Sequence, residues 1–366
     1  MAERFKVLVV GGGPSGSIAA RELAKEGIDT CLFERDLNNL KPCGGGIPST
    51  AFDELALPTT VINKEIREIH IYSPANVKVA IPLKGGHLSM VDRRSFDSAM
   101  RAQAKDAGAT IIEGEFFSIG QTSGVYEASF MLKVSRERMT IKADYVIAAD
   151  GVNSRISSCL GIKPQRCINT IHEEVDGIDG DACEFWFGSE HAPAFYSWVF
   201  PKKGHASIGT GCLKGNPLPM LERFKMRRSV ATNGTARAYR IPMGPRGIWA
   251  ANRILFVGDA AGTVMPLSYE GIYYSMKSGE MAAMAIADAK PGLYEKMWKA
   301  LYAKRFLLMR RLEKHFLKDD AASERLVELH RRPEIQAASM RLWLEKDLKS
   351  KSLLSYIGFL KRFLTG

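Results

Sequence analysis

The feature that most constrains the fold is a glycine-rich segment between a predicted strand and a predicted helix. A short apolar run over residues 5–10 is followed by glycines in Gly-x-Gly-x-x-Gly spacing, namely Gly11, Gly13 and Gly16. A helical pattern then stops at Gly27, and a second apolar run ends at Glu34. The first glycine permits a tight turn, the second lets backbone approach a pyrophosphate, and the third lets the helix pack on the strand. The segment predicts a βαβ unit that binds a dinucleotide, with Glu34 accepting hydrogen bonds from the adenosine ribose.

A second segment far along the chain indicates which dinucleotide is bound. Residues 253–257 form another buried-type strand that ends in Gly258-Asp259, and a long helix is predicted from about Gly271 to Asp288. A nicotinamide dehydrogenase completes its site within one contiguous domain, whereas the longer FAD needs a distant acid for its ribityl hydroxyls. Asp259 suits that role, and the positive end of the helix would stabilise charge at the flavin N1/O2 edge.

The order of elements predicts how the chain is divided. Residues 93–108 read as an amphipathic helix, 143–149 as a buried strand, and Asp150-Gly151 opens a turn. Residues 168–241 are mostly strands, and residues 292–364 are helical throughout. We therefore expect a discontinuous FAD-binding domain at residues 1–73, 88–165 and 250–290. A β-rich substrate domain is expected at residues 74–87 and 166–249. Residues 291–366 are expected to form a helical C-terminal region.

Composition narrows the class of protein further. With 366 residues, 46% of them hydrophobic, the chain can bury a core. Its six cysteines form no Cys-x-x-Cys pair and its seven histidines show no metal spacing, so we expect no disulfide framework and no metal site. No apolar stretch approaches the roughly 18 residues of a membrane span, so we expect neither export nor membrane spanning. The scattered cysteines fit a reducing, cytoplasmic compartment. We expect no nucleic-acid partner.

The glycine fingerprint, Asp150-Gly151 and Gly258-Asp259 together resemble segments of the FAD-dependent hydroxylase and reductase superfamily. This resemblance implies an α/β fold in which an FAD-binding Rossmann-like domain, similar to that of p-hydroxybenzoate hydroxylase, carries an inserted antiparallel β-sheet substrate domain and a helical C-terminal region. Within the superfamily, Lys41-Pro42-Cys43-Gly44-Gly45-Gly46-Ile47-Pro48 and Phe195-Tyr196-Ser197-Trp198-Val199-Phe200-Pro201 with Gly209 resemble geranylgeranyl reductases. Ser73-Pro74, residues 90–93 and residues 270–274 are similar to the chlorophyll and bacteriochlorophyll branch.

The resemblance implies an activity and a set of cofactor contacts. The activity is the reduction of isolated double bonds in a geranylgeranyl chain, carried on a pigment or as the diphosphate, with NADPH or reduced ferredoxin as electron donor. The implied cofactor residues are Gly11, Gly13, Pro14, Ser15, Gly16, Glu34, Arg35, Cys43, Gly44, Gly45, Arg93, Asp150, Gly151, Gly258, Asp259, Pro266, Gly271 and Ile272. The chain departs from the pigment branch at Ala194, usually an acid, and at Tyr269, usually a glycine, so the loop over the flavin is expected to be narrower.

An aromatic segment is the candidate substrate wall. If residues 196–201 form a strand, Tyr196, Trp198 and Phe200 share one face. Hydride addition to an isolated alkene with protonation places partial positive charge on carbon, and aromatic faces stabilise cations by about 0.5–2 kcal/mol each. A turn at residues 201–204 would pair Gly209 with Tyr196 and Ser207 with Trp198, leaving room for a channel. Ordinary sheet core is the alternative interpretation of the same residues.

We assign the candidate catalytic residues as Cys43, Tyr196 and Trp198, and the candidate substrate residues as Tyr196, Trp198, Phe200, Gly209 and Tyr269. The thiol of Cys43, in a glycine-rich loop expected near the flavin, would donate the proton or tune the flavin, unless it is simply a small residue that fits. A water bound by a tyrosine is the other candidate proton donor.

The C-terminal region carries most of the basic charge. Residues 291–366 hold 17 Lys/Arg against 9 Asp/Glu, out of a net charge of +11. Residues 294–318 interleave eight Lys/Arg with Trp298, Leu301, Phe306, Leu307 and Leu308, and residues 353–363 repeat the mixture. This pattern is typical of a helix lying on an anionic membrane, and equally of a packed helix with one solvated face. The resemblance to the pigment branch implies that such a membrane would be photosynthetic. The basic surface would also suit an acidic ferredoxin.

Three alternatives to a pigment-type reductase remain open from the sequence. The chain could be a geranylgeranyl reductase acting on a membrane lipid or quinone. It could be a flavin-dependent monooxygenase or halogenase, since halogenases carry a similar aromatic segment. It could also be a flavin-bearing carrier of tetrapyrroles or isoprenoids. A product that gains hydrogen would indicate a reductase. Product formation that depends on oxygen would indicate a monooxygenase or halogenase, and ligand binding without reoxidation of the flavin would indicate a carrier.

Overall fold

The computed structural model describes residues 3–231, 234–344 and 346. The chain divides into two compact units, each assembled from three segments. Unit 1 comprises Met1–Lys41, Arg93–Cys167 and Ile241–Ala303, and unit 2 comprises Pro42–Asp92, Ile168–Arg240 and Lys304–Gly366. The chain thus leaves and re-enters unit 1 twice, as a discontinuous nucleotide-binding domain with an insertion would require.

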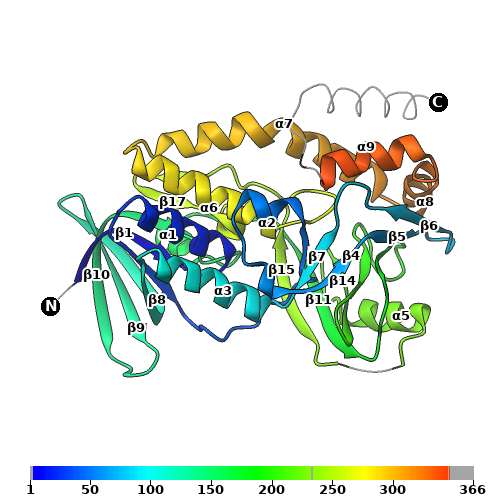
Figure 1. Ribbon diagram of the computed structural model, residues 1–366, viewed down its shortest axis with the longest axis horizontal. Helices are drawn as coiled ribbons and strands as arrows, with labels where there is room; N and C mark the ends of the chain where they lie inside the picture. Colours follow the sequence, from blue (N-terminus) through cyan, green and yellow to red (C-terminus); the bar gives the residue numbers. More distant parts are fainter. Residues whose placement is uncertain (1–2, 232–233, 345, 347–366) are drawn as a thin grey trace. The chain divides into compact units, whose positions relative to one another are not determined.

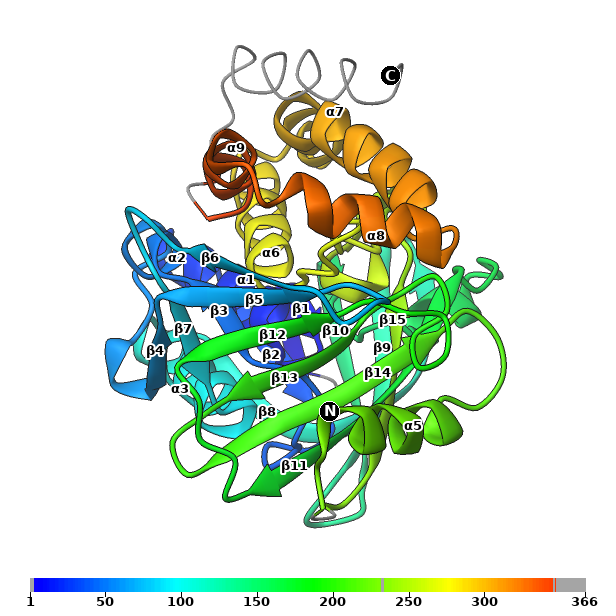
Figure 2. The same ribbon diagram turned by 90° about the vertical axis from the view of Figure 1, so that its right-hand side faces the viewer.

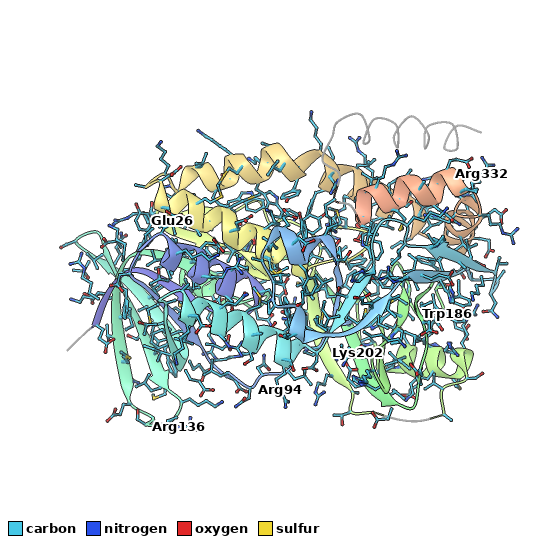
Figure 3. The ribbon with its side chains drawn as sticks, in the orientation of Figure 1. Glu26, Arg94, Arg136, Trp186, Lys202 and Arg332 are labelled. Carbon is cyan, nitrogen blue, oxygen red and sulfur yellow. The ribbon has the colours of Figure 1, made fainter. Side chains whose placement is uncertain are left out.

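Unit 1 is built on a sheet with the order β1-β2-β8-β9-β10-β17-β16 (Figure 1). Its strands are β1 (Glu3–Val10), β2 (Thr30–Glu34), β8 (Thr110–Thr122), β9 (Val125–Leu132), β10 (Arg138–Ala148), β16 (Ala250–Ala251) and β17 (Ile254–Phe256). β1 pairs in parallel with both β2 and β10, β2 with β8, and β10 with β17. Val7–Val10 is buried on both faces, which explains the uninterrupted apolar run that predicted this strand. Arg136 lies at the tip of the β9–β10 hairpin (Figure 3).

Unit 1 also contains helices. They are α1 (Pro14–Lys25), α3 (Arg93–Asp106), α4 (Arg155–Cys159), the 3₁₀ helix η2 (Gly258–Ala260), α6 (Ile272–Ala287) and the first part of α7 (Gly292–Phe316). α1 begins with a proline in its first turn and ends before Gly27, whose φ of +70° suits glycine. α1 and α6 lie side by side (Figure 1), and a Cβ on Gly279 would be 2.1 Å from the Ser15 carbonyl oxygen. The backbones of the two helices therefore approach as closely as glycine alone permits.

Unit 2 contains two sheets, with the orders β15-β11-β14-β13-β12-β5-β6 and β3-β7-β4 (Figure 2). The strands are β3 (Gly46–Pro48), β4 (Ile62–Ile66), β5 (Glu68–Tyr72), β6 (Lys78–Pro82), β7 (Leu88–Val91), β11 (Cys167–Asp176), β12 (Ala182–Trp186), β13 (Ser197–Pro201), β14 (His205–Cys212) and β15 (Arg237–Pro242). The β11–β14, β14–β13, β13–β12 and β5–β6 pairs are antiparallel, whereas β5 and β12 run parallel. The helices are α2 (Thr50–Glu54), η1 (Thr59–Val61), α5 (Leu218–Arg228), α8 (Asp320–Leu329) and α9 (Pro333–Trp343).

The larger sheet of unit 2 has two different faces. One face packs on α5 through a core formed by Ile171, Val175, Trp186, Val199, Ala206, Ile208, Leu221 and Phe224. Trp186 lies beside α5 (Figure 3), with its ring 5.9 Å from that of Phe224. Because side chains alternate along a strand, Trp198 and Phe200 lie on the opposite face from Val199. Strand β13, whose aromatic residues were predicted to form a substrate wall, therefore contributes to two separate apolar layers.

The α/β class, the βαβ opening and the inserted β-rich part are confirmed by this topology. The unit boundaries differ from the expected ones, because residues 42–73 lie in unit 2, where β4 pairs with β7 and β5 pairs with β12. Helix α5 interrupts a stretch that the sequence pattern assigned to strands. The predicted basic mixture at residues 353–363 lies outside the described residues.

Candidate active site

The loop between β1 and α1 has room for glycine alone at two of its three fingerprint positions. Gly11 has φ of +107°, and a Cβ there would lie 2.3 Å from the Ala149 carbonyl oxygen. A Cβ on Gly16 would lie 1.9 Å from the Gly11 carbonyl oxygen. Gly13 is different, because a Cβ there would meet no atom within 4 Å. Gly13 precedes Pro14 and Ser15 at the α1 N-terminus, so the open space lies where a helix binds phosphate.

The carboxylate of Glu34 is held beside this loop. Its Oε2 accepts a hydrogen bond from the Gly12 amide at 2.6 Å, and its Oε1 accepts one from the Asp36 amide at 3.1 Å. Arg101 supports the same loop from α3, donating to the carbonyl oxygens of Gly12 at 3.0 Å and Leu37 at 2.7 Å. Sequence reasoning missed Arg101, whose only signal was a charged residue on the buried side of an amphipathic helix.

The two arginines that the sequence predicted at the cofactor, Arg35 and Arg93, are in contrasting environments. Arg35 is exposed. Arg93, the first residue of α3, is buried, and its guanidinium donates to both carboxylate oxygens of Asp97, at 3.0 and 2.8 Å. This pair fixes the Arg93 side chain within one helical turn.

Asp150 carries one of several buried polar atoms that lack a partner among the described residues. Its Oδ2 accepts from the Ile156 amide at 3.1 Å, whereas its Oδ1 is buried and unpartnered. Burial raises the pKa of this carboxyl. The neighbouring Gly151 has φ of +81°, which allows the chain to turn directly after β10. Thr263 Oγ1 is a second unpartnered buried atom in unit 1.

Asp259 is held by an ion pair that the sequence did not predict. Lys41 Nζ lies 2.7 Å from Asp259 Oδ2, and the Asp259 side chain is only 8% exposed. Gln165 Nε2 donates to the Asp259 carbonyl oxygen at 2.5 Å. The preceding Gly258 has φ of +60°, and its amide donates to Ser278 Oγ at 2.8 Å. The Gly258-Asp259 segment is thus fixed by contacts with Lys41, Gln165 and Ser278.

Helix α6 begins next to this carboxylate. Gly271 immediately precedes Ile272, the first residue of α6, and a Cβ on Gly271 would lie 3.9 Å from Asp259 Oδ1. The loop before the helix contains the buried Pro266 and makes a tight turn, in which Tyr269 has φ of +51° and donates its amide to the Met265 carbonyl oxygen. Tyr269 therefore occupies a conformation that glycine adopts more easily.

These features of unit 1 fit FAD. The glycine loop leaves open space at a helix N-terminus, an acid ends β2, and a second acid stands at the start of α6. The unpartnered oxygens of Asp150 and Thr263 are the kind of buried polar atom that a bound ligand satisfies. Among the described residues, no group of three or more His, Cys, Asp and Glu side chains could hold a metal ion.

The aromatic residues of unit 2 form a continuous layer. The Trp198 ring lies 6.4 Å from Tyr196 and 6.3 Å from Phe200, so these three share one face as the strand period predicted. Phe185 on β12 contacts both ends, at 5.2 Å from Tyr196 and 5.1 Å from Phe200. We call these four residues the aromatic face. Phe185 was not predicted, although it follows the same alternation on the adjacent strand.

The predicted hairpin register was wrong by two residues. Trp198 pairs with Gly209, and Phe200 pairs with Ser207, instead of Tyr196 with Gly209 and Trp198 with Ser207. The reason is the turn, because β13 continues to Pro201, Lys202 bonds to His205, and Gly204 with φ of +82° makes the bend. The space over Gly209 is also filled, since a Cβ there would lie 2.2 Å from Trp198 Cζ2. Gly209 therefore accommodates the indole, and the room predicted over this glycine is filled.

The Cys43 loop covers one end of the aromatic face. A Cβ on Gly44 would lie 2.2 Å from Phe200 Cδ2, so this backbone rests on the phenyl ring. Gly45 has φ of +82°, and its amide donates to Cys43 Sγ at 3.4 Å. Cys43 is a free thiol that is partly exposed. The loop thus packs on the aromatic face through Gly44, next in sequence to Cys43.

A buried polar chain supports the indole of Trp198. Its Nε1 donates to Ser207 Oγ at 3.4 Å, and Ser207 Oγ lies 2.9 Å from His172 Nδ1. The indole N–H can only donate, so Ser207 Oγ accepts this hydrogen bond. Burial, reinforced by the nearby Lys202 charge, lowers the pKa of His172 to about 4, so the ring is neutral. Lys202 itself pairs with Glu174 at 3.0 Å.

The apolar residues predicted along the basic helix α7 differ in their exposure. Trp298 and Phe306 are buried, whereas Leu301 is 43% and Leu307 53% exposed. Lys304 and several other cations accompany these leucines at the surface. Over the described residues, none of the helices has the length and apolarity needed to cross a bilayer.

Three kinds of comparison with known proteins agree. Residues 4–214 match the model of the FAD binding domain family. The geranylgeranyl diphosphate reductase of Synechocystis sp. is 34% identical over 94% of this chain and 93% of its own length. The digeranylgeranylglycerophospholipid reductase of Methanothrix thermoacetophila is 30% identical over 86% of this chain and 88% of its own length. A geranylgeranyl bacteriochlorophyll reductase-like protein from Thermoplasma acidophilum superimposes with a TM-score of 0.84 at 25% identity, over 98% of this chain and 96% of that one.

Proposed function

The chain belongs to the geranylgeranyl reductase family of FAD-dependent oxidoreductases, and from this premise we propose that it saturates isolated double bonds of a geranylgeranyl chain. The single observation that carries the proposal is the aromatic face of unit 2. Its four rings form a layer on the side of the sheet opposite the α5 core. A layer of this kind suits a long apolar chain that offers no polar group for recognition.

The aromatic face also suits the chemistry of an isolated alkene. Protonating such an alkene places positive charge on the more substituted carbon, and no carbonyl is present to spread it. The faces of Trp198 and Tyr196 would stabilise that charge by roughly 0.5–2 kcal/mol each. Both side chains are 7% exposed, so the contact would be made with little water present. These two residues and Phe200 are our candidates for substrate contact, with Tyr269 of unit 1.

We propose that unit 1 holds FAD along the fingerprint loop, Glu34, the Asp150-Gly151 turn and the Gly258-Asp259 segment. Bound FAD, once reduced, supplies the hydride. The residues of the chain bind and orient it. The N–H groups at the start of α1 would receive the pyrophosphate beside Gly13, and the start of α6 at Gly271 would face developing negative charge on the flavin.

The second hydrogen is a proton, and Cys43 is our candidate for delivering it. Its thiol is partly exposed in a loop that packs on Phe200. The Gly45 amide donates to the sulfur, which would stabilise the thiolate left behind after proton transfer. Water would then return the proton to Cys43. Overall, hydride adds to one alkene carbon and the proton adds to the other.

Two residues bear on the head group. Ala194 with φ of +57° and Tyr269 with φ of +51° both adopt left-handed backbone, and both differ from the pigment branch. A tyrosine ring at 269 occupies volume that a glycine would leave free. This favours a compact head group, such as a diphosphate or a glycerophospholipid, over a tetrapyrrole.

The electron donor and the site of action are finer proposals. We favour NADPH or a reduced ferredoxin as donor, the latter because of the net charge of +11. We also propose peripheral membrane contact through the exposed face of α7, where Leu301 and Leu307 accompany Lys304. Vesicle flotation of the protein with anionic and neutral lipids tests that contact.

Product mass tests the proposed activity. The purified enzyme is reduced without oxygen and incubated separately with geranylgeranyl diphosphate, a geranylgeranyl glycerophospholipid and geranylgeranyl chlorophyll. The proposal expects a gain of one hydrogen pair for each double bond reduced, with the diphosphate or the lipid preferred. Absence of any mass gain with all three substrates would overturn it.

A further inference from the structure

Lys41 has no part in the glycine fingerprint that identifies the cofactor, yet it forms an ion pair with Asp259. Lys41 Nζ lies 2.7 Å from Asp259 Oδ2, with side chains 27% and 8% exposed. Lys41 reaches Asp259 across 218 positions of sequence. Both residues belong to unit 1, and Lys41 is its last residue before the chain enters the Cys43 loop.

The surroundings of Asp259 give this pair an electrostatic consequence. A Cβ on Gly271, at the start of α6, would lie 3.9 Å from Asp259 Oδ1, so the carboxylate stands at the positive end of a 16-residue helix. A helix N-terminus carries about +0.5 charge and the carboxylate a full negative charge, so together they amount to about −0.5. Adding the ammonium of Lys41 changes this local sum to about +0.5. The sign of the field at the start of α6 therefore depends on Lys41.

We propose that Lys41 is a positioning residue that sets the reduction potential of the bound flavin by neutralising Asp259. The inference rests on the proposed function, in which the start of α6 faces the flavin. Without Lys41, the carboxylate would oppose the helix N-terminus and disfavour the negative charge that reduction adds. With Lys41, the acid remains available to hydroxyl groups of the cofactor while the helix retains its positive end.

A purely structural role for Lys41 makes a different prediction. If the ammonium only fixed the 258–262 segment, its removal would weaken binding of oxidised and reduced FAD equally. The midpoint potential depends on the ratio of these two affinities, so it would not change. The potential therefore separates an electrostatic role from a structural one.

The test measures the midpoint potential and the FAD dissociation constant of holoenzyme variants in the absence of substrate. Lys41→Met removes the charge while keeping the length of the chain, and Lys41→Arg keeps the charge. Lys6→Met is the matched control, because Lys6 forms an ion pair of 2.9 Å with Asp144 in the same unit but is 54% exposed.

We expect K41M to lower the affinity for reduced FAD, relative to oxidised FAD, at least tenfold, which for two electrons is a shift of about −30 mV. K41R and K6M should retain the wild-type potential, and K41M/D259N should recover most of the shift. An unchanged potential in a K41M protein that still binds FAD would overturn the inference. Since no substrate is present, that result would leave the proposed reduction of geranylgeranyl chains untouched.

Discussion

The indole of Trp198 lies directly on the backbone of Gly209, its paired residue on the neighbouring strand, where a Cβ would be 2.2 Å from Cζ2. The absence of a side chain at 209 therefore determines where the ring at 198 lies. The ring is further held by its hydrogen bond to Ser207. These contacts give the aromatic face a fixed geometry at its centre.

Replacing Gly209 with alanine should displace the indole. The added methyl group overlaps the ring, so we expect a loss of about 1–3 kcal/mol in the free energy of unfolding, as for other overpacked sites. Tryptophan fluorescence and urea denaturation measure the two effects. Gly120→Ala is the control, because a Cβ on that strand glycine would meet no atom within 4 Å. Equal behaviour of the two variants would contradict the proposed seat for Trp198.

The error in the predicted register shows what the sequence could and could not specify. The alternation of residues 196–200 correctly predicted a shared face, because the strand period is a local property. The pairing partner depends on which residues make the turn, and Pro201 was assigned to the turn although it lies in β13. A shift of two residues preserves the face but changes every neighbour across the strands. The room expected over Gly209 is therefore taken up by the indole of Trp198.

The cofactor segments were predictable for a related reason. Gly11 makes a turn with positive φ and Gly16 packs against the Gly11 carbonyl oxygen five residues earlier, so their spacing alone identifies the loop. Arg101 comes from a helix without any motif, and Lys41 opens the segment that resembles geranylgeranyl reductases but gives no sign of its partner. Only the tertiary fold brings these two charges to the loop and to Asp259. Side chains that support a binding site through long-range contacts leave no periodic signal in a sequence.

Two buried histidines should make the protein sensitive to acid. Burial lowers the pKa of both His172 and His191 to about 4, from an ordinary value of 6.5. As the pH falls from about 6.5 to about 4, the unfolded chain gains these protons and the folded chain does not, so stability falls over this window. Each histidine should account for roughly 2–3 kcal/mol by pH 4. Urea denaturation across this pH range measures the slope.

His191→Asn tests the assignment for one of these residues. Asparagine can replace the contact of Nδ1 with Ser197 Oγ, which is 2.7 Å long, but takes up no proton. The variant should lose part of the acid sensitivity, whereas His205→Asn, at a half-buried site, should keep it. A wild-type pH slope in H191N would show that another group dominates.

Cys43→Ala should slow reduction of the alkene while leaving FAD in place. Loss of a general acid typically costs 10²–10⁴-fold in rate, so we expect kcat to fall by about that factor. Cys43→Ser retains a proton donor of similar size and should be less impaired. Flavin absorbance of the purified variants confirms cofactor content. If C43A reacts at the wild-type rate, the proton comes from another group or from water.

Tyr269→Gly should widen the range of head groups. Glycine relieves the left-handed backbone at φ of +51°, but the buried ring is lost, so we expect a lower melting temperature overall. The ratio of kcat/KM for geranylgeranyl chlorophyll to that for geranylgeranyl diphosphate should rise. Tyr269→Phe, which keeps the ring, should leave the ratio unchanged. An unchanged ratio in Y269G would exclude a role for this residue in head-group selection.

Anaerobic stopped-flow absorbance shows whether reduced flavin transfers hydride to an isolated alkene. Reduced holoenzyme is mixed with geranylgeranyl diphosphate or the glycerophospholipid in the absence of oxygen. We expect flavin absorbance to return at a rate that increases with substrate concentration, and the product to gain the matching hydrogen pairs. Flavin that stays reduced until oxygen is admitted, with an oxygenated or halogenated product, would contradict this hydride transfer.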